Sequence, residues 1–177
     1  MSPRLSDGPV EGPTADLLRA RRGGVLTALD RLLLHSPPVA EGWNALLGAL
    51  RGSTTLPADL RELVVLRVAV LTGAAFEWAA HEPIGRRAGL TDRHLRVLRA
   101  GDPTAEPVWT PVQAAVLAFT DASTRTVAVP EPVFAGVREH LDDRQVVELT
   151  ALVGGYAMVS RFLVALRVPP PDGEVAG

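Results

Sequence analysis

The chain has 177 residues, of which 47% are hydrophobic and 21% charged, a composition typical of one globular domain with its own core. Its formal net charge is −2, so it lacks the basic surface expected of a protein that binds nucleic acid or an anionic membrane. It has no cysteine, which excludes disulfides, a thiolate nucleophile and thiolate-bound metals. All of its cationic side chains are arginines, so a Schiff-base lysine and a P-loop lysine are excluded as well.

Two tails rich in proline and glycine, residues 1–13 and 169–177, flank the region that we expect to fold, and we expect both to be flexible. The polar N-terminus lacks the pattern of a secretion signal, and the longest apolar runs are short or interrupted by arginine. We therefore expect a cytoplasmic protein without a membrane span, in which residues 14–168 form a single domain.

Helical periodicity dominates the first half of this domain. The first helix is ended by Ser-Pro-Pro at residues 36–38, and its apolar face consists of Val25, Leu29, Leu32 and Leu33. A second helix precedes Gly52. The run from Ala58 to Leu71 is apolar nearly all round, which indicates a buried helix.

The second half is divided by helix start and stop signals. A helix between Gly73 and Gly89 comes first, and N-cap residues at Thr91, Thr110 and Asp142 mark the starts of three later ones. Another helix covers residues 130–141, and no alternating strand pattern is present. The sequence therefore predicts an all-α, single-domain bundle of roughly eight helices.

The last predicted helix is long, apolar on most sides, and contains the adjacent residues Gly154 and Gly155. Paired glycines weaken a helix, and the usual compensation is the close approach of another backbone. That backbone could belong to the same monomer or to a second subunit. We favour the subunit interface, and hence a homo-oligomer.

The segment FEWAAHEPIG, residues 76–85, places Glu77 and His81 four residues apart on one helical face among apolar neighbours. Opposing effects of burial and mutual attraction are how a site brings an acid and a base close to neutral pH. Pro83 should kink the helix beside this pair and open space for a ligand. In the alternative, Glu77 is a surface residue, His81 packs between helices, and Pro83 begins a separate helix.

Glu62 is the third candidate, because it lies in the helix that we expect to be buried, where a carboxylate needs a partner or must become neutral. Arg61 or Arg67 could be that partner. If the chain folds back at Gly73, however, Glu62 would approach Glu77 and His81.

The stretch RELVVLRVAVLTGAAFEWAAHEPIGRRAGLTDRHLRVLRAGD resembles the core of the carboxymuconolactone decarboxylase and alkylhydroperoxidase D-like (AhpD-like) superfamily. The similarity extends over residues 32–67 and 143–168, and so covers most of the chain between the tails. The resemblance implies an all-helical fold that assembles as a homo-trimer or homo-hexamer.

The peroxidase branch of that family has a glutamate, a CxxC motif twelve residues later, and a histidine four residues after the second cysteine. Glu62 falls at the glutamate and His81 at the histidine, whereas Ala74 and Glu77 stand at the two cysteine positions. Thiol peroxidase chemistry is thus excluded. The decarboxylase branch, which needs no cofactor, implies proton transfer next to a carbonyl with loss of carbon dioxide or a double-bond shift.

We therefore expect a cofactor-free lyase or isomerase acting on a small carbonyl or carboxylate compound. His81 would be the general acid or base, Glu77 would orient it or share the proton, and Glu62 would be a second acid/base group or hold the other nitrogen of His81. One alternative is a non-catalytic oligomeric binding or scaffold protein on the same fold. A third hypothesis is a divalent-metal enzyme that uses the same three side chains.

Four further residues are weaker candidates for binding the substrate. Arg67 could hold a carboxylate, although a buried arginine more often pairs with an acid of the protein. His35 stands at a helix end, where a histidine usually interacts with the helix dipole. Trp78 and Tyr156 could line the pocket, although packing is their ordinary role.

Overall fold

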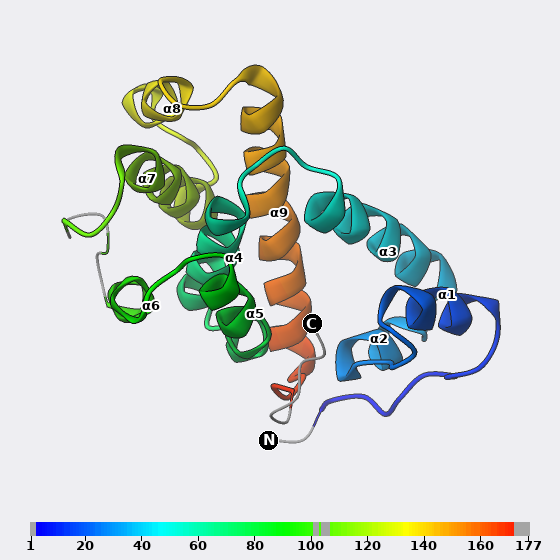
Figure 1. Ribbon diagram of the computed structural model, residues 1–177. Coiled ribbons are helices and arrows are strands. Elements are labelled where there is room, and N and C mark those ends of the chain that lie inside the picture. The colour runs from blue at the N-terminus through cyan, green and yellow to red at the C-terminus, as the bar shows by residue number, and fades with distance from the viewer. Residues whose placement is uncertain (1–2, 101–102, 104–106, 172–177) are drawn as a thin grey trace.

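The computed structural model describes residues 3–100, 103 and 107–171. Within these residues the chain forms α-helices and no β-strand (Figure 1), which confirms the all-α prediction. The helices are α1 (Pro13–Arg21), α2 (Ala28–Leu33), α3 (Pro37–Gly52), α4 (Ala58–Thr72), α5 (Ala75–Arg87), α6 (Asp92–Arg99), α7 (Pro111–Thr126), α8 (Glu131–Arg138) and α9 (Asp143–Leu166).

The first expected helix is limited to α2, and α1, which we did not expect, precedes it. Gly23 and Gly24 have φ angles of 66° and 98°, a conformation that glycine adopts at little cost and that ends α1. Thr27 and Asp30 then form a capping box that starts α2. Val25 consequently lies in the connecting turn and is 64% exposed, instead of contributing to an apolar helix face as we expected.

The N-caps expected at Thr91, Thr110 and Asp142 are all present. Each side chain accepts a hydrogen bond from the backbone N–H three residues later, and the side chain at that position accepts one in return. At Thr91 the reciprocal partner is His94, whose ring also stacks on Trp109. These caps fix the points at which the chain enters α6, α7 and α9.

Helix α4 lies at the centre of the molecule, packed against α5, α7 and α9 (Figure 1). Nearly all of its residues from Leu60 to Ala69 are buried, as the apolar run predicts. Gly73 follows with φ 68°, the left-handed conformation that commonly ends a helix. The chain then folds back, so that α5 lies along α4.

Helix α9 has 24 residues and a window of mean hydropathy 1.7, so by length and composition alone it is the helix, among the described residues, that could cross a membrane. Half of that window is buried inside this fold, against α3, α4 and α7. A Cβ at Gly155 would lie 2.9 Å from Leu50 Cδ1, whereas no atom lies within 4 Å of one at Gly154. Close packing within the monomer therefore accounts for Gly155, although we favoured a subunit interface for the pair.

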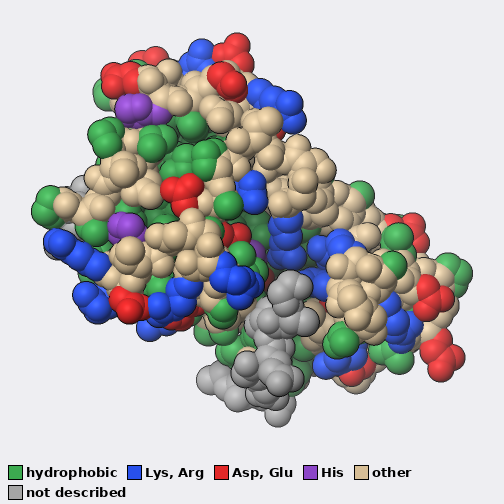
Figure 2. Space-filling view, viewed as in Figure 1, with side chains coloured by type: hydrophobic (Ala, Val, Ile, Leu, Met, Phe, Trp, Pro, Cys, Tyr) green, Lys and Arg blue, Asp and Glu red, His purple; other side chains and the backbone are tan. Residues whose placement is uncertain are grey.

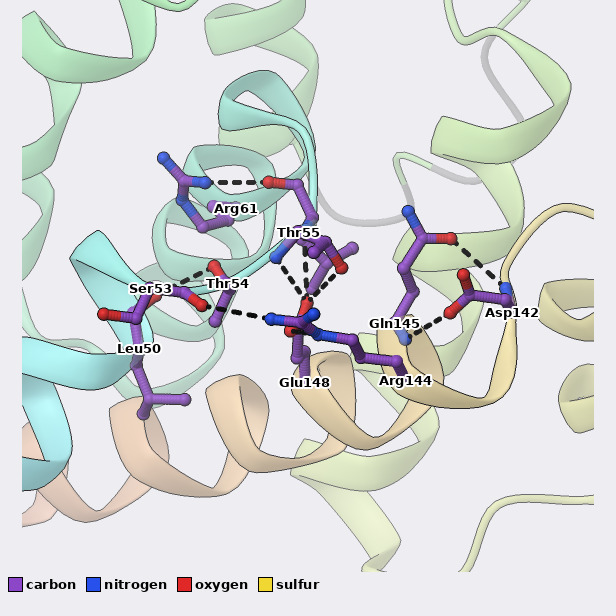
Figure 3. A network of polar contacts seen from close by, with 10 residues as sticks. Leu50, Ser53, Thr54, Thr55, Arg61, Asp142, Arg144, Gln145 and Glu148 are labelled. Atoms are coloured by element: carbon purple, nitrogen blue, oxygen red, sulfur yellow. Dashed lines mark hydrogen bonds and ion pairs between the residues drawn. The ribbon is translucent and has the colours of Figure 1, made fainter.

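The loop between α3 and α4 is attached to α9 by Glu148 (Figure 3). The Glu148 carboxylate accepts hydrogen bonds from the N–H and hydroxyl groups of Thr55, from the N–H of Leu56, and from Arg144 Nε. Although burial raises the pKa of Glu148, these hydrogen bonds lower it overall. This attachment holds the end of α3, where Arg51 lies, close to α9.

Part of the expected N-terminal tail is bound to the domain. Arg4 donates hydrogen bonds to the carbonyl oxygens of Ala165 and Leu166, and Gly8 N donates to that of Arg31. A Cβ at Gly8 would lie within 3 Å of three backbone atoms between Arg31 and His35, so only glycine fits there. The first two and last six residues of the expected tails lie outside the described residues.

Candidate active site

Glu62 and His81 form a buried hydrogen-bonded pair between α4 and α5. Glu62 Oε2 lies 2.7 Å from His81 Nδ1, and the two residues are 9% and 3% exposed. A carboxylate only accepts hydrogen bonds, so His81 donates its Nδ1–H, and in the neutral form of the ring the lone pair then lies on Nε2. The fold-back at Gly73 thus brings together two of the three residues singled out from the sequence.

The other nitrogen of His81 faces Tyr156 of α9 and Glu77 of α5. His81 Nε2 lies 3.4 Å from the Tyr156 hydroxyl and 3.5 Å from Glu77 Oε2. Glu77 is 2% exposed, and its Oε2 has no hydrogen-bond partner. An unpaired buried carboxylate oxygen costs stability, and such groups persist mainly where function requires them.

Tyr156 joins this centre to Arg51. Arg51 Nε donates to the Tyr156 hydroxyl oxygen over 2.8 Å, which leaves the hydroxyl proton free to point at His81 Nε2. Burial, assisted by the charges of Glu77 and Glu62, raises the pKa of Tyr156 to about 12, although Arg51 acts in the opposite direction. Tyr156 is therefore a neutral hydroxyl donor at physiological pH.

Helix α5 is continuous through Pro83, so the alternative in which this proline begins a separate helix is wrong. Pro83 has no N–H to donate to the carbonyl of Ala79, one turn earlier. The alternative in which Glu77 is a surface residue is wrong too, since Glu77 is buried. The proposed pairing of Glu62 with a nearby arginine is not found: Arg61 donates to the Leu56 carbonyl.

Two arginines close to this centre, Arg21 and Arg51, had no place in the sequence-based site. Both lie in the last turn of a helix, α1 and α3, where a cation ordinarily interacts with the helix dipole. Burial and the charges of Arg22 and Arg51 lower the pKa of Arg21 to about 10. No local spacing could reveal them, because Arg51 and its partner Tyr156 are 105 residues apart.

Arg67 has other partners than a substrate in this structure. It is 1% exposed, and it donates from Nε and Nη2 to Asp121 and from Nη1 to the Leu98 carbonyl. All three nitrogens of its guanidinium are thus engaged. The residue joins α4 to α6 and α7, in keeping with the ordinary role of a buried arginine.

Trp78 and His35 also direct their polar atoms elsewhere. Trp78 Nε1 donates to Glu82, and the Arg99 guanidinium lies 4.2 Å from the centre of a Trp78 ring. The His35 ring lies at the protein surface, and its Nε2 is 2.9 Å from the Ser6 carbonyl oxygen. Of the four weaker candidates, Tyr156 is the one that contacts His81.

The donor geometry does not suit a metal ion. Glu62 and Glu77 approach opposite nitrogens of the His81 ring, so the three side chains do not converge on one point. No group of three potential metal ligands of the His, Asp and Glu type occurs within the described ranges. The metal-enzyme hypothesis for these three residues is therefore set aside.

A shallow surface pocket lies apart from this centre, between α5 and α6. It is lined by Glu82, Arg86, Asp92, Leu95, Arg96 and Arg99. Arg86 pairs with both Glu82 and Asp92, and Arg99 pairs with Glu82, so the acids of this pocket are already neutralised. The chemistry is better placed at the buried centre.

The fold and site agree with comparisons to known proteins. The Carboxymuconolactone decarboxylase family matches residues 37–131, more than half of the chain, and the chain belongs to this family. YdfG of Bacillus subtilis, an uncharacterised protein, is 28% identical over 108 residues, which cover 60% of this chain and 72% of YdfG.

Solved structures show the same AhpD-like fold. The protein ATU0492 of Agrobacterium tumefaciens, of unknown function, is 26% identical with a TM-score of 0.72, covering 78% of this chain and 94% of its own. A peroxidase-related protein with an alkylhydroperoxidase AhpD core, from Ralstonia eutropha, is 19% identical with a TM-score of 0.80, covering 97% and 95%. The predicted family and fold are confirmed, in a chain that lacks redox cysteines.

Proposed function

We propose that this protein is a cofactor-free lyase or isomerase that transfers a proton to or from a carbon next to a carbonyl group in a small carbonyl or carboxylate compound. The supporting observation is the 2.7 Å hydrogen bond between Glu62 and His81 Nδ1, which fixes the ring and leaves Nε2 as the reactive atom. Glu62 also stabilises the imidazolium that forms when Nε2 takes a proton.

Proton removal next to a carbonyl moves the electron pair of the C–H bond onto the carbonyl oxygen as an enolate. Loss of carbon dioxide from a 3-oxo acid gives the same enolate, whose carbon then takes the Nε2 proton of protonated His81, and the ring returns to its neutral form. The neutral Tyr156 hydroxyl, supported by the positive charge of Arg51, is the donor that would stabilise the enolate oxygen. Glu77, beside Nε2, is placed to share the proton.

Proton NMR in D2O tests this function on a set of compounds that share the expected chemistry. A panel of small 2-oxo acids, 3-oxo acids and unsaturated lactone acids would be screened for exchange of the hydrogen next to the carbonyl and for loss of carbon dioxide. We expect His81→Ala to lower the rate of a positive reaction by 100-fold or more, on the order of a general acid–base contribution. His140→Ala, at an exposed histidine, is the matched control and should have no effect.

Glu62→Gln sharpens this test, because glutamine can still accept the Nδ1–H hydrogen bond but cannot stabilise the imidazolium by charge. It should lower the rate while circular dichroism shows an intact fold. Full activity in His81→Ala would contradict the assignment. Equal binding of a panel compound to wild type and His81→Ala, with no turnover by either, would favour the non-catalytic binding protein instead.

A further inference from the structure

Arginines from the N-terminal helices gather beside the candidate active site. Arg21 ends α1, Arg22 follows it, and Arg51 lies in the last turn of α3. Figure 2 shows basic side chains in the hollow between the α1–α3 part and the rest of the molecule, and all of them are arginines because the chain has no lysine. The site is therefore acidic at Glu62 and Glu77 and basic on its N-terminal side.

Of these three arginines, Arg22 is paired with a carboxylate, and Arg21 and Arg51 are not. Arg22 Nε lies 3.1 Å from a carboxylate oxygen of the fully buried Asp30. Arg51 bonds through Nε to the uncharged Tyr156 hydroxyl. Arg21 forms no ion pair with any residue that the structure describes, and its Nε is buried without a hydrogen-bond partner. Two half-buried guanidinium groups thus lie together without a bound carboxylate.

The charge of Arg21 is unfavourable here unless an anion joins it, whereas Tyr156, Glu77 and Glu62 raise the pKa of Arg51 against the effect of burial. Burial and the neighbouring cations Arg22 and Arg51 lower the pKa of Arg21, so these surroundings do not stabilise its charge. A guanidinium presents paired N–H donors that match the two oxygens of a carboxylate. A carboxylate between the two side chains would remove the repulsion and satisfy the free donors.

We propose that Arg21 and Arg51 form an anion-binding subsite for a carboxylate group of the substrate, next to Tyr156 and His81. The proposal rests on the proposed function in that it places the reacting carbon at His81 Nε2. Two cations stabilise a negatively charged carboxylate far more than neutral carbon dioxide, so they would oppose loss of the carboxylate that they bind. The carboxylate bound at this subsite is therefore one that remains in the product. The substrate is thus an organic acid that reacts at a position other than this carboxylate.

Tyr156 is the only tyrosine of the chain and reports on the subsite directly. With tyrosine labelled by ¹³C at Cζ, the protein gives one signal next to Arg51. Acetate and its neutral isostere acetamide would be titrated in chloride-free buffer. Acetate should shift the signal saturably and acetamide should not.

Substitutions test which arginines bind the acetate. We expect Arg21→Gln and Arg51→Gln each to weaken acetate binding about tenfold or more, the scale of one charge-assisted hydrogen bond. Arg87→Gln, which removes an exposed arginine of α5, should leave it unchanged. Because Arg21→Gln removes a repelled charge, it should not lower the midpoint of thermal unfolding. If Arg51→Gln does not fold, Arg51→Lys keeps the charge and should retain acetate binding.

A response that is the same for acetate and acetamide, or one that Arg21→Gln leaves unchanged, would overturn the subsite. His81→Ala separates this result from the proposed function: it should keep acetate binding and lose turnover. Acetate binding by wild type without turnover of any acid of the panel would support the subsite and contradict the proton-transfer function.

Discussion

A single hydrogen bond decides which atom of His81 is available for chemistry. Because Glu62 accepts from Nδ1, the lone pair of the neutral ring faces the buried side chains of Tyr156 and Glu77. Tyr156 in turn receives a hydrogen bond from Arg51 and can direct its own proton at the ring. These five side chains come from α3, α4, α5 and α9, so the site depends on the packing of these helices.

Tyr156 should make stability depend on pH above pH 10. Its pKa of about 12 in the folded protein exceeds the ordinary value of 10.0, so the unfolded chain ionises first. The contribution of Tyr156 to the free energy of unfolding is complete below pH 10. It is lost as the pH rises toward 12, by about 1.4 kcal/mol per pH unit. Urea unfolding of wild type and Tyr156→Phe between pH 9 and 12 measures it.

The difference in the free energy of unfolding between wild type and Tyr156→Phe isolates the effect of Tyr156. Arg21, whose pKa is lowered to about 10, contributes with the opposite sign over the same range, because the folded protein loses that proton first. Both proteins keep Arg21, whose pKa depends mainly on burial and on Arg22 and Arg51, so most of its effect cancels. A stability difference that stays constant from pH 9 to 12 would contradict the environment described for Tyr156.

Local spacing could predict the acidic half of the site but not the basic half. Glu77 and His81 are one helical turn apart, and a single reversal of the chain at Gly73 brings Glu62 to them. The helical period and the lengths of the two helices are therefore enough to predict that these three residues meet. Arg21 and Arg51 reach the same place through the packing of α1 on α3 and of α3 on α9. No periodicity in the sequence encodes that arrangement.

At the element scale, α4 holds the fold together through its buried polar residues as well as its apolar ones. The ion pair between Arg67 and Asp121 joins α4 to α7, and the bond from Arg67 to the Leu98 carbonyl adds the end of α6. A buried guanidinium that loses its carboxylate is strongly destabilising, because it remains charged without a partner.

Asp121→Asn should therefore lower the free energy of unfolding by about 3 kcal/mol while leaving turnover intact. Asp16→Asn, at a surface carboxylate that pairs with Arg19, is the control and should change it by less than about 1 kcal/mol. Denaturant titration gives both values. Unchanged stability with lost turnover would instead favour substrate binding by Arg67, the weaker of its two roles considered from the sequence.

The glycine pair in α9 offers a matched comparison of packing. Both Gly154→Ala and Gly155→Ala gain about 1 kcal/mol in helix propensity, so their difference isolates the contact between position 155 and Leu50. We expect Gly155→Ala to be about 1 kcal/mol less stable than Gly154→Ala, because Leu50 must move. Equal stabilisation by the two substitutions would contradict the close packing of α3 on α9.

At the scale of the whole molecule, the helix pattern of the sequence predicts the architecture well. Capping residues and apolar periods specify where helices begin and which of them is buried, and these are local properties. The prediction for Val25 is wrong because this apolar residue lies beside Gly23 and Gly24, whose positive φ angles override the helical period.

The homo-oligomer stays a prediction, and α9 offers a face for it. Val147 and Met158, eleven residues apart on one side of this helix, are 68% and 38% exposed, and water disfavours such apolar side chains. We expect native mass spectrometry to give a trimer or hexamer, and Met158→Glu to shift it toward monomer. A wild-type monomer at micromolar concentration would contradict this expectation.

The central claim is that Glu62 holds the Nδ1 proton of His81 and leaves Nε2 free to transfer protons. ¹⁵N NMR of the imidazole nitrogens, with His81 assigned by comparison with His81→Gln and the ring neutral, tests it directly. We predict a protonated Nδ1 and an unprotonated Nε2, and loss of this tautomer preference in Glu62→Met, which cannot accept the bond as a carboxylate does. A wild-type ring that carries its proton on Nε2 would contradict the account.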